Sequence, residues 1–198
     1  MIVIISNPEQ IPQEHQIINE LFDEGLELFH LRKPNYSKTI LVNLLKKINP
    51  EHYSKIVLHQ HYVLNKYFNI NRLHFSESKR LSDFNSGLNL FKTLGFWLST
   101  SVHSINDYEQ LPKEFSYAFY GPLFESISKP GYKPASSEII QIKKKTETKI
   151  IAIGGIKPEN IRQVMKQGFD GVALLGAVWN NPDNAVEVFR QCRENANM

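Results

Sequence analysis

The sequence predicts a compact (β/α)8 barrel, a TIM barrel, and three observations lead to that fold class. Eight short apolar runs alternate along the chain with segments of helical character. The runs IVII at 2–5 and IIAI at 150–153 are apolar throughout, which is typical of parallel strands buried on both faces. The length of 198 residues is close to the lower limit of about 200 residues for such barrels. We therefore expect one domain over residues 1–198, with several short helices.

The first half of the chain supplies four of the expected strands. They cover residues 2–6, 26–31, 55–59 and 72–75. Helices are expected between them at 39–48 and 62–69, and another before Gly25, which stands where helices often end. Each expected helix follows a strand, as a parallel sheet requires.

The second half supplies the other four strands. They cover residues 96–101, 117–120, 149–153 and 171–174. Pro158 suits the first position of a helix that Gly168 closes, and Asn181-Pro182 begins the last helix. The alternative architecture is an open doubly wound sheet, which normally binds phosphate at a glycine-rich turn after its first strand. Here that turn reads SNPE at 6–9, without glycine, so the barrel is favoured.

Composition narrows the class of protein. The net charge is +3 and the Lys and Arg residues are scattered among acids, so we expect no nucleic-acid partner. No apolar run approaches the roughly 18 residues that span a bilayer, so we expect no membrane partner. Cys192 is the one cysteine, which excludes an internal disulfide and favours a reducing compartment. We expect a cytoplasmic protein with a small phosphorylated ligand, for which a few cations suffice.

The end of the second predicted strand carries two cations. In a barrel, the catalytic residues gather where the strands end. Strand alternation directs His30 and Arg32 the same way, toward the mouth of the barrel. Arg32 and Lys33 suit a phosphate or pyrophosphate, Arg through its planar fork and Lys as a point charge. The alternative is a surface lysine beside a structural Arg–carboxylate pair.

Two glycine-containing loops predict a phosphate site. Gly154 and Gly155 follow the strand at 149–153, and Leu175 and Gly176 follow the strand at 171–174. Glycine lets a phosphate approach backbone N–H groups, and the loops after strands 7 and 8 are the usual phosphate site of these barrels. The alternative is that the glycines only make tight turns.

The loop at 121–132 has the composition of a segment that closes over a ligand. Ser126 and Ser128 supply hydroxyls and Lys129 an ammonium group. Exposed loops often carry such residues without a function, and that alternative stays open.

Histidines and carboxylates define the candidate acid–base groups. His30, His59, His74 and His103 lie at or near strand ends, where each could be a general base or a hydrogen-bonded structural residue. Carboxylates are sparse there, which argues against a dedicated magnesium site. The pair formed by His59 and His61 suggests zinc, but no third ligand is evident. We therefore expect no metal site.

Five motifs in order along the chain carry a family resemblance. They are HLRKP at 30–34, STSVHS at 99–104, YGPLFESISK at 120–129, AIGGI at 152–156 and GVALLGAV at 171–178. Together they resemble the thiamine phosphate synthase family, which includes the related thiazole tautomerases. The resemblance implies a (β/α)8 barrel that couples hydroxymethylpyrimidine diphosphate with a thiazole phosphate carboxylate and releases pyrophosphate.

The resemblance also implies roles for individual residues. Arg32 matches the arginine that holds the diphosphate, and Ser101 matches the serine of the fifth strand. Ser126, Ser128 and Lys129 match the loop that closes over the substrate. Gly155, Leu175 and Gly176 match positions whose backbone amides hold the thiazole phosphate.

The chain departs from the family pattern at the diphosphate half of the site. His30 replaces a glutamine and Pro34 a lysine, and the two aspartates that would bind Mg²⁺ are absent. Mg²⁺ is therefore implied only for a true synthase, and otherwise no cofactor. This asymmetry favours, as an alternative, a metal-independent thiazole tautomerase. Pro122 replaces the tautomerase histidine, so His30, His103 or Glu125 would supply the base.

Two further alternatives remain open, and so does the oligomeric state. One is a non-catalytic protein that binds a phosphorylated ligand, and the other is an unrelated phosphosugar isomerase on the same fold. A homodimer is compatible with all of these interpretations.

Overall fold

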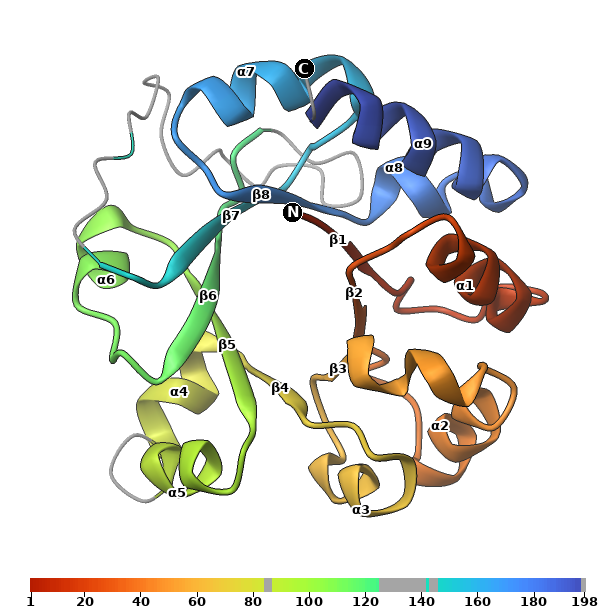
Figure 1. The fold of residues 1–198 in the computed structure, drawn as a ribbon, viewed down its shortest axis with the longest axis horizontal. Coiled ribbons are helices and arrows are strands. Elements are labelled where there is room, and N and C mark those ends of the chain that lie inside the picture. Colours follow the sequence, from red (N-terminus) through yellow and green to blue (C-terminus); the bar gives the residue numbers. More distant parts are fainter. Residues whose placement is uncertain (84–86, 125–141, 143–145, 197–198) are drawn as a thin grey trace.

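The computed structural model describes residues 1–83, 87–124, 142 and 146–196. Eight parallel strands form a closed barrel in chain order (Figure 1). They are β1 (Ile2–Ile5), β2 (Leu28–Leu31), β3 (Ile56–Leu58), β4 (Arg72–Phe75), β5 (Trp97–Val102), β6 (Phe115–Tyr120), β7 (Lys149–Ile153) and β8 (Gly171–Leu174). The barrel closes where β1 pairs with β8, with Ile4 beside Leu174. The predicted (β/α)8 fold class is confirmed.

Helices surround the barrel on its outside (Figure 1). They are α1 (Glu14–Asp23), α2 (Lys38–Leu45), α3 (Asn65–Phe68), α4 (Glu77–Asp83), α5 (Leu88–Thr93), α6 (Ile105–Glu109), α7 (Ile161–Lys166), α8 (Gly176–Trp179) and α9 (Ala185–Ala196). Short 3-10 turns occupy η1 (Pro50–Lys55), η2 (Tyr62–Leu64), η3 (Pro158–Asn160) and η4 (Pro182–Asn184). Helices of four residues, such as α3 and α8, let a barrel close within so short a chain. Within the described residues, no helix is long and apolar enough to cross a bilayer.

Each strand is buried on both faces, which explains the continuous apolar runs. In β1, Ile2 and Ile4 belong to the core between the barrel and the helices, whereas Val3 and Ile5 belong to the core inside the barrel. The inner core is completed by residues from other strands, among them Phe119. Side chains of successive residues point to opposite faces of a strand, so both faces need apolar residues here.

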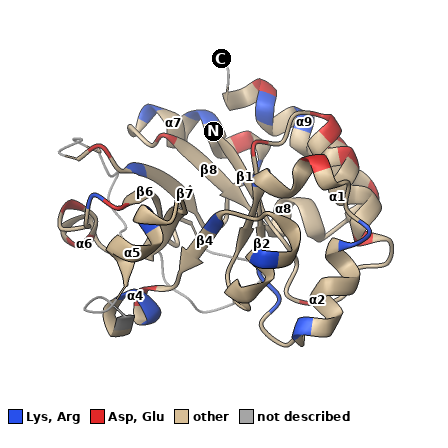
Figure 2. Cartoon of the chain, turned by 60° about the horizontal axis from the view of Figure 1, so that its bottom comes forward, with Lys and Arg blue, Asp and Glu red and all other residues tan. Residues whose placement is uncertain are grey.

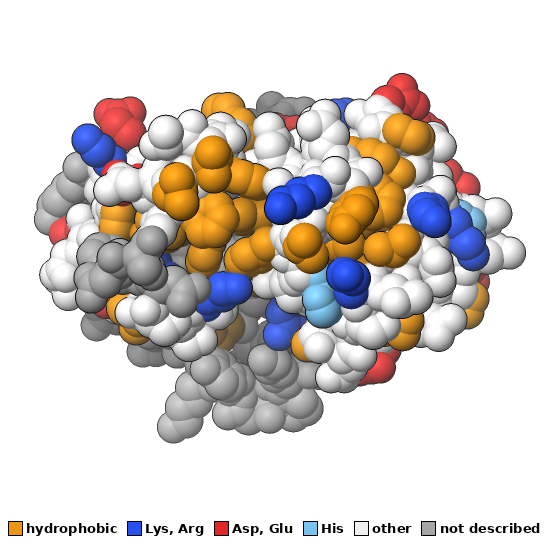
Figure 3. Space-filling model, turned by 90° about the horizontal axis from the view of Figure 1, so that it is seen from below, with side chains coloured by type: hydrophobic (Ala, Val, Ile, Leu, Met, Phe, Trp, Pro, Cys, Tyr) orange, Lys and Arg blue, Asp and Glu red, His pale blue; other side chains and the backbone are white. Residues whose placement is uncertain are grey.

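Charged and apolar side chains are distributed differently over the molecular surface. Lys and Arg lie on many elements (Figure 2). Apolar side chains gather on the side of the barrel that carries α2 to α5 (Figure 3). The large exposed ones on these elements and their flanks are Ile40, Val63, Tyr67, Leu81, Leu90, Leu94 and Trp97.

Candidate active site

A cavity of about 700 Å³ lies at the carboxyl ends of the strands. This is the end of a barrel where active sites form. Residues that follow five different strands line the cavity. Its polar lining comprises Arg32, Ser101, His103, Lys157, Asn160 and Asn180, and its glycines are Gly121, Gly154, Gly155 and Gly176. Ile5, Phe119 and Ala173 are among the apolar side chains of the wall.

The loop after β7 depends on its two glycines. Gly154 has a φ of 97° and Gly155 a φ of 65°, in the left-handed region that favours glycine. A Cβ atom on Gly154 would lie 2.6 Å from Cα of Pro122, so glycine allows this loop to pass close to the loop after β6. Asn160 Nδ2 donates to Gly155 O at 2.9 Å. Backbone of this loop therefore faces the cavity in a fixed conformation.

The loop after β8 lies against the same part of the cavity. Leu175, Gly176 and Ala177 all line it. Trp179 Nε1 donates to Ile5 O at 2.7 Å, which ties α8 to the end of β1. The structure thus brings together Gly154, Gly155, Leu175 and Gly176, the four residues that the sequence assigned to phosphate. Their role as phosphate ligands stays a prediction.

Two hydrogen bonds between the backbone of Arg32 and the side chain of Ser6 hold Arg32 at the mouth of the barrel. Arg32 N donates to Ser6 Oγ at 2.8 Å, and Ser6 Oγ donates to Arg32 O at 2.9 Å. These bonds fix the chain just beyond β2, and the side chain of Arg32 lines the cavity. A guanidinium group at this position is suited to bind a phosphate or carboxylate.

Lys33 lies elsewhere than the sequence predicted. Its side chain is fully buried, and Nζ lies 2.7 Å from Glu14 Oε2 and donates to Glu9 O at 2.7 Å. Burial raises the pKa of Glu14 and lowers that of Lys33, while the ion pair opposes both shifts. Lys33 points away from Arg32 and contacts α1 and the chain before it, so its charge is already compensated. This placement argues against the predicted role in phosphate binding.

His103 is oriented to act as a base. Its Nδ1 lies 2.6 Å from Gly121 O, and a carbonyl oxygen only accepts, so Nδ1 carries the hydrogen. When the ring is neutral, Nε2 therefore carries the lone pair. Nε2 is 3.8 Å from Glu77 Oε2, and the side chain is 52% exposed. The predicted candidate His103 thus lines the cavity, and its Nε2 is the ring nitrogen that does not bond to Gly121.

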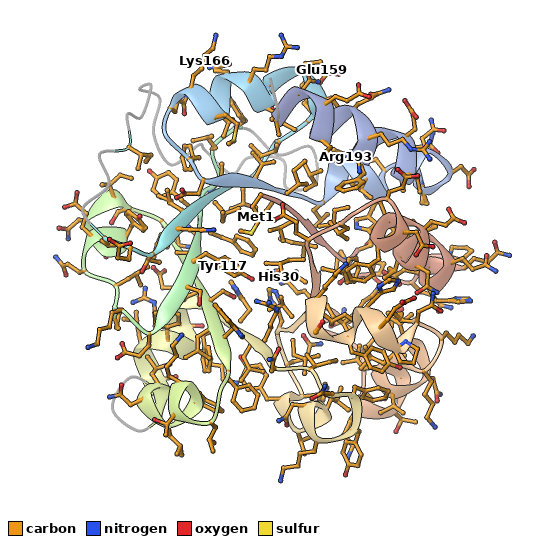
Figure 4. All side chains as sticks on the ribbon, in the orientation of Figure 1. Met1, His30, Tyr117, Glu159, Lys166 and Arg193 are labelled. Carbon is orange, nitrogen blue, oxygen red and sulfur yellow. The ribbon has the colours of Figure 1, made fainter. Side chains whose placement is uncertain are left out.

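His30 was expected at the mouth of the barrel, but it lies inside. Its ring is fully buried; Nδ1 is 2.8 Å from His59 Nε2 and Nε2 is 2.6 Å from Tyr117 Oη (Figure 4). His74 is beside them, with Nδ1 3.0 Å from Ser99 Oγ and Nε2 3.1 Å from the Oγ of Ser101, which lines the cavity. The three imidazoles therefore lie directly beneath the cavity.

The barrel interior keeps these three histidines neutral. Burial lowers the pKa of His30 and His59 well below 6.5 and that of His74 to about 3. The positive charges of Arg32 and Arg72 make smaller contributions of the same sign. Desolvation penalises the imidazolium form, so each ring can accept at one nitrogen and donate at the other.

Sequence reasoning considered these histidines singly and missed their convergence. It paired His59 with His61, whose Nε2 instead lies 3.1 Å from Tyr36 O in an exposed position. The useful signal is strand register. His30 pairs with Val57 and Leu58 with Leu73, so His59 and His74 occupy successive inward positions beside His30.

Four of the predicted site residues belong to the loop after β6. They are Ser126, Ser128, Lys129 and Glu125, and all four lie outside the described residues.

The described lining of the cavity contains no Asp or Glu, and magnesium prefers carboxylate oxygens. The residues that line the described cavity therefore do not fit the Mg²⁺ ion that the resemblance implies.

Comparisons with known proteins agree with this architecture. A family model described as thiamine monophosphate synthase matches residues 2–178. A thiamine-phosphate synthase of Listeria welshimeri is 34% identical over 91 residues, which are 43% of this chain and 44% of that protein, so this match spans less than half of that relative. One from Pelagibacter ubique is 25% identical over 192 residues, covering 90% and 89% of the two chains. A solved thiamine phosphate pyrophosphorylase of Bacteroides thetaiotaomicron aligns over 99% of this chain and 97% of its own, with a TM-score of 0.76 and 25% identity.

Proposed function

The chain belongs to the thiamine monophosphate synthase family, and from this premise we propose that it is a cytoplasmic transferase of thiamine biosynthesis. Its reaction would join hydroxymethylpyrimidine diphosphate to a thiazole phosphate carboxylate and release pyrophosphate. One observation carries the proposal: Arg32 and the glycine loops after β7 and β8 line the same cavity. Two anionic groups can therefore be held in one space between apolar walls.

The proposed chemistry relies on charge stabilisation and positioning. The bond between the pyrimidine methylene carbon and the diphosphate oxygen breaks, and the thiazole nitrogen bonds to that carbon. The carboxylate of the thiazole then leaves as CO₂, and one proton from water is taken up by carbon, which gives thiamine phosphate beside the released pyrophosphate. Arg32 stabilises the negative charge that develops on the departing pyrophosphate. Backbone N–H groups near Gly155 and Gly176 hold the thiazole phosphate and so place its nitrogen about 3–3.5 Å from the carbon it attacks. No step is assigned to a magnesium ion, because the described lining lacks its ligands.

A second candidate function is thiazole tautomerisation, and the orientation of His103 favours it. Its Nδ1–H is directed to Gly121 O at 2.6 Å, which leaves Nε2 able to remove a proton from the ring of a bound thiazole phosphate carboxylate. The same nitrogen would return that proton to a carbon outside the ring of the same molecule, so no atom is gained or lost. This isomerisation needs no diphosphate and no metal, in keeping with a cavity whose described lining has no carboxylate.

One assay separates the candidates. Purified protein is incubated with the thiazole phosphate carboxylate, with and without hydroxymethylpyrimidine diphosphate. Formation of thiamine phosphate and pyrophosphate supports the transferase. Isomerisation of the thiazole without the diphosphate supports the tautomerase. Saturable ligand binding without any turnover would overturn both and leave a non-catalytic binding protein.

Substitution of Arg32 tests the diphosphate half of the site. We expect Arg32→Gln to weaken pyrophosphate binding about 10- to 150-fold, since a hydrogen bond to a charged group contributes about 1.5–3 kcal/mol. Isothermal titration calorimetry with inorganic pyrophosphate measures the effect. Arg190→Gln is the matched control, because Arg190 pairs with Glu24 on the outer surface. Equal affinities of Arg32→Gln and the wild type would remove Arg32 from the site.

Substitution of His103 tests the tautomerase. Asn in place of His103 retains an N–H donor for Gly121 O but has no basic nitrogen. We expect the rate of isomerisation to fall about 100- to 10,000-fold, the usual contribution of a general base, with little change in thiazole phosphate binding. His61→Asn is the control, because His61 is exposed and does not line the cavity. Unchanged isomerisation by His103→Asn would exclude His103 as the base.

A further inference from the structure

We propose that His30, His59 and His74 form a binding site for a divalent transition-metal ion, for which zinc is the best match. The site lies inside the barrel beneath the cavity. One ring nitrogen of each histidine lies within 4.8 Å of the other two. The proposal concerns metal binding alone and does not depend on which reaction the cavity supports.

The distances are compatible with tetrahedral coordination. Zinc binds imidazole nitrogen at about 2.0–2.1 Å, so two ligand nitrogens lie about 3.3 Å apart. His30 Nδ1 and His59 Nε2 are 2.8 Å apart, and an ion between them requires that they separate by about 0.5 Å. All three ligand nitrogens lie within 4.8 Å of one another, so no other spacing must shorten by more than about 1.5 Å. The rings of His59 and His74 are stacked, with centroids 4.2 Å apart and planes at 23°. Binding therefore also requires one of these rings to turn about its side-chain bonds until both lone pairs point to the ion.

Hydrogen bonds on the far side of two rings orient them as ligands. His30 Nε2 lies 2.6 Å from Tyr117 Oη, and His74 Nδ1 lies 3.0 Å from Ser99 Oγ. Ser99 Oγ itself donates to Leu73 O, so it accepts from His74. When these far nitrogens donate, His30 Nδ1 and His74 Nε2 carry the lone pairs; His30 Nδ1 faces His59 Nε2, and His74 Nε2 lies 3.1 Å from Ser101 Oγ. Metal-binding histidines usually have such a partner on the second nitrogen.

Two residues that line the cavity also contact the cluster. Ser101 Oγ lies 3.1 Å from His74 Nε2, and Ser101 lines the cavity. Phe119, also in the lining, covers the rings of His30 and His74 at centroid distances of 4.7 and 5.1 Å. Three imidazoles leave the fourth position of a tetrahedral ion to a further ligand.

The ligand type and the surrounding charge specify the ion. Imidazole suits zinc, copper, nickel and iron, whereas magnesium needs oxygen ligands. Arg32 and Arg72 are the cations whose charge reaches the three rings, and both oppose an added positive charge. We therefore expect weaker binding than at a site with carboxylate ligands, and no binding of magnesium.

Cobalt titration of the purified full chain tests the site. After removal of metal with a chelator and dialysis, Co²⁺ is added and its visible absorption is recorded. We expect saturation at one ion per chain, with the absorption of a tetrahedral or five-coordinate complex, and its loss when Zn²⁺ but not Mg²⁺ is added. Failure of Co²⁺ to produce a saturable absorption, together with no heat of Zn²⁺ binding, would overturn the proposal.

Variants connect the absorption to the three histidines. We expect His59→Gln to abolish the cobalt absorption, and Tyr117→Phe to lower Zn²⁺ affinity about 10- to 100-fold through the orientation of His30. His61→Gln is the matched control and should bind as the wild type does. Circular dichroism of each metal-free variant verifies folding. If His59→Gln does not fold, X-ray absorption of the zinc-loaded wild type decides, because imidazole ligands support the site and a shell of oxygen ligands alone overturns it.

Discussion

At the scale of single residues, Arg32 and Lys33 are neighbours in the chain with opposite environments. Arg32 lines the cavity, whereas the ammonium group of Lys33 is buried and 2.7 Å from Glu14. The alternation of side chains at the end of β2 separates them. A cation beside a predicted phosphate site is therefore not by itself a phosphate ligand, and here one of the two ties the segment before α1 to the barrel.

We expect the buried ion pair between Lys33 and Glu14 to affect the free energy of unfolding. Lys33→Met leaves the carboxylate of Glu14 buried without its cation, and we expect a loss of about 3–5 kcal/mol in the free energy of unfolding. The double variant Lys33→Met/Glu14→Leu removes both charges and should recover most of that loss. Urea denaturation measures both. Lys157→Met is the control, because Lys157 is exposed and 4.0 Å from Glu159. A double variant as unstable as Lys33→Met would contradict this account.

At the scale of elements, the loop after β8 offers the cleanest test of the phosphate site. A Cβ atom on Gly176 would be 3.6 Å from the side chain of Asn180, an ordinary contact, and its φ is not positive. We therefore expect Gly176→Val to fold, while its added methyl groups obstruct the backbone that the cavity exposes. Thiazole phosphate affinity should fall about 10- to 100-fold, equivalent to the loss of a charged hydrogen bond. Calorimetry of ligand binding measures this change.

The matched control is Gly87→Val. Gly87 precedes α5, does not line the cavity, and its Cβ would be 3.7 Å from Phe91. Its affinity should equal that of the wild type. If Gly176→Val binds as tightly as Gly87→Val while both remain folded, the loop after β8 does not hold the phosphate.

Some strands could be predicted from the sequence with their exact bounds, and others could not. β4, β7 and β8 have the predicted bounds, because apolar runs with polar or glycine flanks mark where they begin and end. β6 begins at Phe115 rather than residue 117, since Ser116 interrupts the apolar pattern. The residues that line the cavity were largely predictable, because strand ends converge in any barrel. The burial of Lys33 and the histidine cluster were not, because they depend on partners from other elements.

At the scale of the whole molecule, closure of the barrel desolvates its interior polar groups. His30 and His74 are buried within a ring of eight strands, and His59 adjoins them. An open sheet would expose at least one end of such a row to water. The pKa values of these three rings are therefore lowered only while the whole barrel is folded.

The final prediction is that acid destabilises the metal-free protein through these histidines. The unfolded chain binds their protons near pH 6.5, whereas the folded chain does not, since burial lowers the pKa of His74 to about 3 and the other two well below 6.5. The unfolded state then binds more protons, so the free energy of unfolding falls as the pH falls below about 6.5. Each ring contributes up to about 1.4 kcal/mol per pH unit, or about 4 for the three. Urea denaturation in the presence of chelator, from about pH 7.5 to 5, measures how the free energy of unfolding depends on pH.

The variant His74→Gln tests the contribution of one ring. It should reduce the slope by about 1.4 kcal/mol per pH unit, whereas the control His61→Gln should leave the slope unchanged. A slope that His74→Gln does not alter would show that the interior rings do not control acid stability.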